Sequence, residues 1–147
     1  MQTFEERFFD GKVTLQSLPV TDGTSGHSEP LLKRMLLAKG ELAQFHDSDW
    51  PMHYIAFIEL RPGHSRGNHY HMIKQEHVYL ICGRIQLRLK DIHSGACAVV
   101  EMITGSLVQI EPGIAHVLRP LSMGQAIEFS PTRFNPRDTY PADLETP

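Results

Sequence analysis

One segment carries most of the structural information in this chain: Gly63-His-Ser-Arg-Gly-Asn-His69-Tyr-His71-Met-Ile-Lys-Gln-Glu76-His-Val-Tyr-Leu-Ile-Cys-Gly83. On a β-strand, successive side chains point to opposite faces, so His69 and His71 point the same way. The residues from 72 to 75 are enough to turn the chain back, so Glu76 on the following strand can face the same pocket. We therefore expect two imidazoles and one carboxylate on one wall.

A second segment supplies a fourth candidate ligand. Residues 105–116 read GSLVQIEPGIAH, and Pro112-Gly113 predicts a turn just before His116. Imidazole nitrogens with one carboxylate suit a divalent transition metal rather than Ca²⁺ or Mg²⁺. The sequence thus predicts one metal ion, whether zinc, iron, nickel or manganese, held by His69, His71, Glu76 and His116. Its occupancy should fall as the histidines become protonated.

The chain from residue 51 onward has the pattern of an all-β protein. Residues 85–90 alternate strictly between apolar and polar side chains, as in a strand with one buried face. Other short apolar runs follow at near-regular spacing with Gly, Pro or Asp between them. Such a series without intervening helices favours a sandwich or a barrel. The predicted strands cover residues 53–60, 76–82, 85–90, 98–103, 106–110, 115–118 and 126–129.

Three regions are expected along the chain. Residues 1–50 are predicted to be an irregular extension packing on the barrel, residues 51–130 the core, and residues 131–147 a proline-rich tail over the surface. Within the extension, Pro30–Leu37 has apolar residues at positions that suit one face of a helix, although the same residues could form a strand at a sheet edge.

Composition excludes several classes of protein. Of the 147 residues, 41% are hydrophobic and 21% charged, which argues against a disordered chain, and no apolar run is long enough to span a bilayer. The net charge of −3 disfavours a nucleic-acid partner. The first residues do not resemble a secretion signal, and two cysteines are too few for a disulfide framework. These features indicate a cytoplasmic protein that binds neither nucleic acid nor a membrane.

The spacing of the candidate ligands resembles that of the cupins. The pattern G-x5-H-x-H-x4-E-x6-G matches the first cupin signature at every fixed position, from Gly63 to Gly83. The second signature matches at Gly105, Gly113 and His116. Glu111 stands where that family has proline, and Pro120 stands where an asparagine often closes the signature. The resemblance implies a single cupin jelly-roll β-barrel, with the metal held inside by His69, His71, Glu76 and His116, and commonly a homodimer.

The string Arg66-Gly-Asn-His69-Tyr-His71 is similar to cupin domains of sugar-nucleotide and capsular-polysaccharide enzymes. It also resembles metal-free 3,5-epimerases of deoxysugar synthesis, in which the histidine matching His69 is the base and the position matching His71 is not histidine. Because His71 is present here, the resemblance implies a metal-dependent enzyme that isomerises or epimerises a carbohydrate or sugar nucleotide. Arg66 and Lys74 are the candidate substrate contacts. Two alternatives stay open: a metal-dependent dioxygenase and a non-catalytic ligand-binding cupin.

Overall fold

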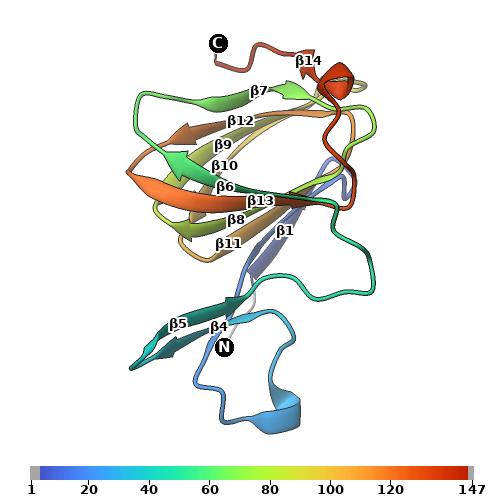
Figure 1. Cartoon of the computed structure of the whole chain (residues 1–147). Coiled ribbons are helices and arrows are strands. Elements are labelled where there is room, and N and C mark those ends of the chain that lie inside the picture. Colours follow the sequence, from blue (N-terminus) through green and yellow to red (C-terminus); the bar gives the residue numbers. More distant parts are fainter. Residues whose placement is uncertain (1–3, 146–147) are drawn as a thin grey trace.

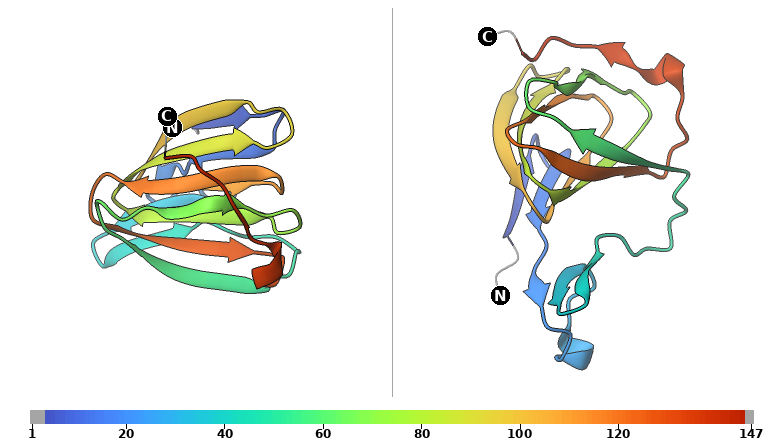
Figure 2. Two further views of the ribbon diagram at one scale, coloured as in Figure 1. Left: turned by 90° about the horizontal axis from the view of Figure 1, so that it is seen from above. Right: turned by 60° about the vertical axis from the view of Figure 1, so that its left-hand side comes forward.

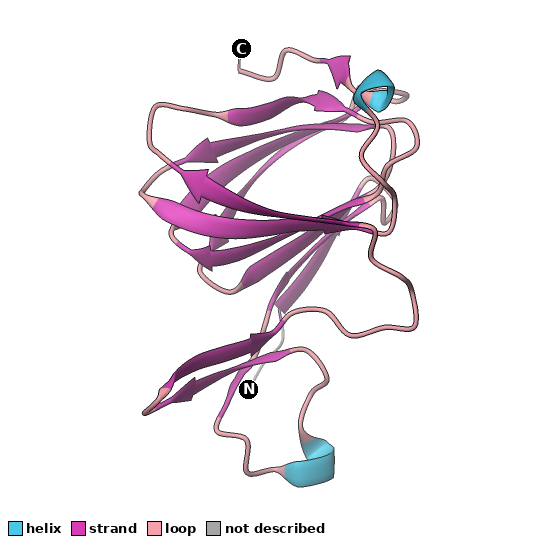
Figure 3. Ribbon diagram, in the orientation of Figure 1, coloured by secondary structure: helices cyan, strands magenta, loops and turns pink. Residues whose placement is uncertain are grey.

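The computed structural model describes residues 4–145 as an almost entirely β-stranded protein (Figures 1 and 3). The helical segments of this range are two short 3-10 turns, η1 (Gly26–Ser28) and η2 (Pro136–Asp138). Residues 1–3, which entered the argument against a secretion signal, and residues 146–147 of the predicted tail lie outside the described range. Among the described residues, no helix has the length and apolar character needed to cross a membrane.

Two antiparallel sheets make up the body of the molecule. The first has the strand order β1-β2-β11-β8-β13-β6 and the second has the order β10-β9-β12-β7-β14. The strands of the first sheet are β1 (Phe4–Phe8), β2 (Val13–Ser17), β6 (Tyr54–Leu60), β8 (Glu76–Cys82), β11 (Ser106–Ile110) and β13 (Gly124–Ser130). Those of the second are β7 (Arg66–Tyr70), β9 (Arg84–Asp91), β10 (Cys97–Ile103), β12 (Ile114–Pro120) and β14 (Tyr140–Pro141).

The hydrophobic core lies between these two sheets, which run around a common interior (Figure 2). The side chains of strand β9 alternate between the interior and the surface, so Ile85, Leu87 and Leu89 are almost fully buried in this core. Val78 and Leu80 of β8 meet them from the facing sheet. The predicted jelly-roll fold is thereby confirmed. The sheets stay separate within the described residues and are not hydrogen-bonded into one closed barrel.

The N-terminal extension is more regular than predicted. Strands β1 and β2 form a hairpin that extends the six-stranded sheet through β11. A third, small sheet of β3 (Val20–Thr21), β4 (Lys33–Leu37) and β5 (Gly40–Gln44) lies below the body in Figure 1. The helix considered for residues 30–37 is wrong, because β4 pairs with both β3 and β5. The ring of Phe45, just after β5, stacks on Tyr79 of β8 at 4.5 Å between centroids, which joins this segment to the outer face of the large sheet.

The tail crosses the body and returns to the second sheet. After η2, strand β14 pairs with β7, and the ring of Tyr140 stacks on Tyr70 with 5.2 Å between centroids. This pairing places η2 directly over the end of β7, where the candidate ligands are found (Figure 1).

Candidate metal centre

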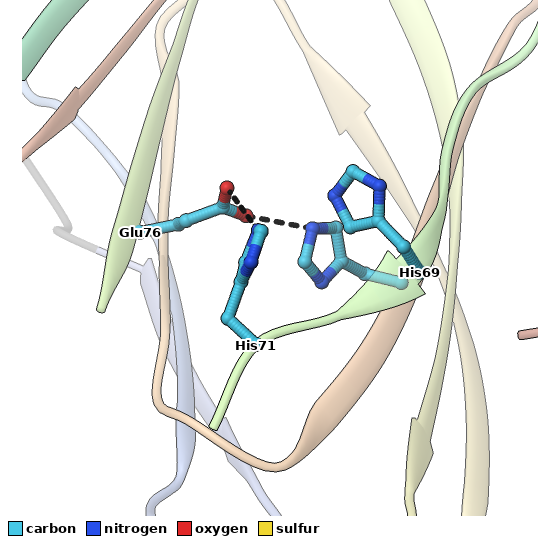
Figure 4. Close-up of side chains that lie close together, drawn as sticks. His69, His71 and Glu76 are labelled. Atoms are coloured by element: carbon cyan, nitrogen blue, oxygen red, sulfur yellow. Dashed lines mark hydrogen bonds and ion pairs between the residues drawn. The ribbon is translucent and has the colours of Figure 1, made fainter. Parts of the chain in front are cut away.

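The four predicted ligands meet inside the molecule. His69 lies on β7, His71 directly follows that strand, Glu76 begins β8 and His116 lies on β12. One ligand atom from each lies within 4.8 Å of those of the other three. Figure 4 shows the side chains of His69, His71 and Glu76 directed toward one another. His71, Glu76 and His116 are at most 5% exposed, and His69 is partly buried.

Strand pairing accounts for much of this geometry. His116 of β12 is the register partner of His69 of β7, so both rings leave adjacent strands at the same level. The register then shifts by one residue, because Val117 pairs with Gly67 and not with Asn68. Gly67 has a φ of +90°, and a Cβ at this position would lie 2.8 Å from the carbonyl oxygen of His116. Close approach of the two strands therefore requires glycine here.

Replacing Gly67 by alanine should separate the two strands. We expect Gly67→Ala to lower the free energy of unfolding by roughly 2 kcal/mol more than Gly63→Ala, and to weaken metal binding, because only the first adds a clash to backbone strain. Gly63 is a matched control, since its φ is +84° and its Cβ would meet no atom within 4 Å. Urea unfolding and zinc titration of both variants provide the measurement. Equal losses in the two variants would contradict this account of the bulge.

Glu76 is the centre of the cluster. Its Oε1 lies 3.0 Å from Nε2 of His71, and its Oε2 lies 2.6 Å from Nε2 of His116. The ammonium of Lys74 is 3.2 Å from the same Oε1. This carboxylate, almost fully buried, is thus surrounded by nitrogen atoms, as a buried negative charge requires.

The other ring nitrogens of the two buried histidines are held by backbone carbonyls. Nδ1 of His71 lies 2.6 Å from the carbonyl oxygen of Asp138, and Nδ1 of His116 lies 3.0 Å from that of Ile114. Each Nδ1–H therefore donates to a carbonyl, which directs Nε2 at Glu76. A lone pair on Nε2 would repel the carboxylate unless a proton or a metal cation shared the space. The donor set, with its carbonyl-anchored rings, fits a divalent transition metal.

The pKa shifts of the four residues also fit a metal site, in which His69 is neutral and Glu76 is negatively charged. Burial, followed by the positive charge of His116, lowers the pKa of His69 to about 4. Burial alone would raise the pKa of Glu76, but the His116 and His71 imidazoles outweigh it and hold that pKa well below its usual range. Burial likewise opposes charge on His71 and His116, yet Glu76 raises the pKa of both. The cluster therefore attracts positive charge, which protons or a metal ion can supply.

Asp138 is a residue that sequence reasoning missed. Its carboxylate accepts hydrogen bonds from the backbone N–H groups of Met72, Ile73 and Lys74, at 2.9 to 3.2 Å. Its own carbonyl orients His71. Asp138 of η2 therefore fixes the loop that connects two of the ligands. The nearest signal in the sequence is the Asn135-Pro136 pair that starts this 3-10 turn, and it says nothing about the loop 64 residues earlier.

Asp138→Ala keeps the carbonyl that contacts His71 but removes the carboxylate that anchors η2 to the loop between His71 and Glu76. We expect metal affinity to fall by about 10-fold, at the lower end of the usual cost of disturbing a group that orients a ligand. Asp138→Asn, which keeps one acceptor oxygen, should lie between the parent and the alanine variant. Zinc affinity by calorimetry checks this ranking, with Asp49→Ala on the exposed surface as the control. Unchanged affinity in Asp138→Ala would show that the loop holds its shape without the carboxylate.

A cavity of about 350 Å³ opens beside the cluster. His69, Glu76 and His116 form part of its wall, and Arg66 and Glu128 also face it. The remaining lining residues are Tyr54, Ala56, Phe57, Ile58, Gly67, Val78 and Leu118. The lining therefore combines a polar, metal-competent group of side chains with a larger apolar set, as is usual for small-molecule sites.

The two predicted substrate contacts lie in different surroundings. Arg66 is exposed, lines the cavity and donates from Nε to the carbonyl of Glu59 at 3.0 Å. Lys74 is only 5% exposed and is not among the lining residues. Its ammonium lies 3.0 Å from Oε1 of Glu128 and 4.2 Å above the ring of Tyr54. A direct substrate contact does not fit this position, because Lys74 sits behind the carboxylates of the cavity.

His77, the neighbour of Glu76, faces the other side of the sheet, as strand alternation predicts. Its ring stacks on Phe129 at 4.8 Å between centroids and lies 6.3 Å from the ring of His46. It therefore belongs to the packing of the outer face and not to the cluster.

Similar solved structures share the fold over most of the chain. A dTDP-6-deoxy-D-glucose-3,5-epimerase from Legionella pneumophila, in complex with dTDP-4-keto-L-rhamnose, has a TM-score of 0.71 and 14% identity, covering 95% of this chain and 77% of that one. A sugar 3,4-ketoisomerase from Thermoanaerobacterium thermosaccharolyticum, in complex with TDP, has a TM-score of 0.68 and 14% identity, covering 87% and 86%. This likeness confirms the predicted jelly-roll fold.

A capsular polysaccharide assembling protein from Staphylococcus aureus has a TM-score of 0.58 and 21% identity. The match covers 82% of this chain but 35% of that protein, which is much longer. No curated protein sequence matches the chain. A family model described as the polysaccharide biosynthesis C-terminal domain matches residues 38–131, well over half of the chain. The chain therefore belongs to the polysaccharide biosynthesis C-terminal domain family.

Proposed function

We propose that this protein is a metal-dependent enzyme that epimerises or isomerises a keto sugar carried on a nucleotide. The observation that carries the proposal is the buried cluster of three histidines and one glutamate in the wall of a cavity of about 350 Å³. The similar epimerase and ketoisomerase structures support the substrate class, since their ligands are a dTDP-sugar and TDP.

The proposed ligands of the metal are His69, His71, Glu76 and His116. A divalent cation held by them would supply Lewis-acid polarisation of the substrate carbonyl. Zinc, iron, nickel and manganese all suit this donor set. His69, Glu76 and His116 line the cavity, whereas His71 does not. A metal ion held by these residues would therefore be accessible to a substrate in the cavity.

The protein's other residues supply orientation. Arg66, at the exposed end of the cavity, suits the phosphate groups of a nucleotide through its planar array of N–H donors. Phe57, Ile58 and Leu118 form an apolar wall that suits a sugar carbon face and limits the access of water.

Metal-dependent exchange with solvent tests the proposal. Apo-protein is loaded separately with zinc, nickel, manganese or anaerobic ferrous iron, and incubated in D₂O with dTDP- and UDP-linked 4-keto-6-deoxy sugars. We expect deuterium to enter the carbon next to the carbonyl, as NMR reports, and to do so only after metal is added. Absence of exchange in every combination would refute the enzymatic proposal.

The same incubations separate the two alternatives. Oxygen uptake with catechol, flavonol, thiol or diketone substrates, together with no exchange in the sugars, would instead identify a dioxygenase. Tight binding of a sugar nucleotide that mass spectrometry recovers unchanged would identify a ligand-binding protein.

A further inference from the structure

We infer that Glu128 is the catalytic residue that removes the substrate proton, and that Lys74 is the positioning residue that holds it in place. This inference rests on the proposed function. It begins from the two carboxylates that line the cavity, Glu76 and Glu128. Both oxygens of Glu76 face imidazoles, whereas the side chain of Glu128 is 18% exposed compared with 5% for Glu76. Glu128 is therefore the carboxylate that a molecule in the cavity can reach.

The backbone fixes Glu128 beside the cluster. It lies on β13, between its register partners Ala56 on β6 and Val78 on β8. All three residues line the cavity, so Glu128 is presented to it from a strand and not from a loop. A proton-transfer group on a strand that is paired on both sides meets the requirement that its position vary little.

Lys74 holds the carboxylate from behind. Its ammonium donates to Oε1 of Glu128 at 3.0 Å and is also 3.2 Å from Oε1 of Glu76. The ring of Tyr54, 4.2 Å from the ammonium, covers another side of the charge. Because Lys74 does not line the cavity, it orients Glu128 without taking the place of the substrate.

In the proposed reaction Glu128 first accepts a proton from the substrate and then gives one back. The C–H bond next to the substrate carbonyl breaks and its proton forms an O–H bond with the Glu128 carboxylate. The electron pair of that bond forms a carbon–carbon double bond, and the carbonyl π pair moves to the oxygen as an enolate. The protonated Glu128 then returns a proton to the same carbon, the carbonyl re-forms and the carboxylate is restored. In an isomerisation the hydroxyl proton on that carbon passes to the enolate oxygen, Glu128 protonates the former carbonyl carbon, and the new carbonyl forms at the first carbon. In an epimerisation the returning proton reaches the opposite face of the enolate from water, and Glu128 gives its own proton to solvent. Exchange of the O–H proton with D₂O between the two transfers labels the substrate.

Removal of the carboxylate should abolish labelling but not metal binding. In the metal-loaded protein we expect Glu128→Gln to lower kcat for deuterium exchange by about 10²- to 10⁴-fold, with KM little changed and metal content equal to that of the parent. Glu59→Gln, on the exposed side of neighbouring β6, is the matched control and should exchange at the parental rate. The conservative variant Glu128→Asp should keep part of the activity.

A rescue experiment separates proton transfer from a structural role. Formate added to Glu128→Ala should restore part of the exchange rate, because a small carboxylate can occupy the vacated space, and chloride at equal ionic strength should not. Parental exchange in Glu128→Gln would overturn the inference while leaving the proposed function intact. Loss of metal from Glu128→Gln would overturn it as well, by making Glu128 a support of the metal site. Absence of exchange in the parent itself would overturn both.

Discussion

Replacing His116 by alanine is expected to weaken zinc binding by about 100-fold or more, since total binding energies of roughly 10–16 kcal/mol are shared among four ligands. His116 is 2% exposed, and its Nε2 lies 2.6 Å from Glu76. Calorimetric titration of the dialysed apo-protein and elemental analysis of the loaded protein measure the loss.

His64→Ala is the matched control for this substitution. It removes an imidazole from the exposed loop before β7, so metal content and affinity should equal those of the parent. Unfolding curves of the two apo-variants show whether the loss in His116→Ala reflects a missing ligand or a collapsed fold. Parental zinc affinity in a folded His116→Ala protein would refute the ligand set proposed here.

The ligand residues were predictable because their positions depend on local rules. Strand alternation alone places His69 and His71 on one face, and a short loop returns the chain at Glu76. His116 required only the turn at Pro112-Gly113 and a strand that follows it. The meeting of His116 with His69 goes beyond these rules, because it depends on the pairing of β12 with β7. In the sequence only the resemblance to the second cupin signature indicated it.

The residues around the ligands were not predictable in the same way. Asp138 contacts a loop 64 to 66 residues earlier in the chain, and no periodicity links the two. Lys74 is predicted from the sequence as a substrate contact, because a charged residue in a loop is usually accessible. Its burial becomes visible only when β13 brings Glu128, 54 residues later, to within 3.0 Å. Sequence patterns predict the four clustered residues, whereas the charges around them depend on contacts that only the fold creates.

The ambiguity at residues 30–37 has a different cause. Apolar residues at positions 31, 32, 35 and 36 satisfy a helical face, so periodicity could not exclude a helix. The structure resolves it through pairing: β4 is bonded to β5 in the register Met35 to Leu42, and Arg34 forms an ion pair with Glu41 at 2.6 Å. Partners on a neighbouring strand decided the outcome, and these are invisible in a short window of sequence.

Replacing Lys74 by methionine is expected to destabilise the metal-free protein by about 3–5 kcal/mol, the usual effect of removing one partner from a buried ion pair. Methionine keeps nearly the same length but leaves Glu76 and Glu128 without the ammonium between them. Lys39→Met is the control. Lys39 is exposed in the turn between β4 and β5, so the same substitution should change the free energy of unfolding by about 0.5 kcal/mol or less. Urea unfolding of the apo-proteins compares the two.

Two further measurements attribute the loss at Lys74 to charge. In Lys74→Met/Glu128→Gln one of the two carboxylates is gone, so this double variant should be more stable than Lys74→Met alone, a coupling that independent sites would not show. Zinc should also reduce the difference in unfolding free energy between Lys74→Met and the parent. A divalent cation beside Glu76 would replace the missing positive charge, and it would bind only the folded state. Additive losses of unfolding free energy in the double variant would mean that Lys74 acts through packing. A difference between Lys74→Met and the parent that zinc leaves unchanged would mean the same. If both effects are seen, the ammonium and the proposed metal ion are two cations that stabilise one buried carboxylate.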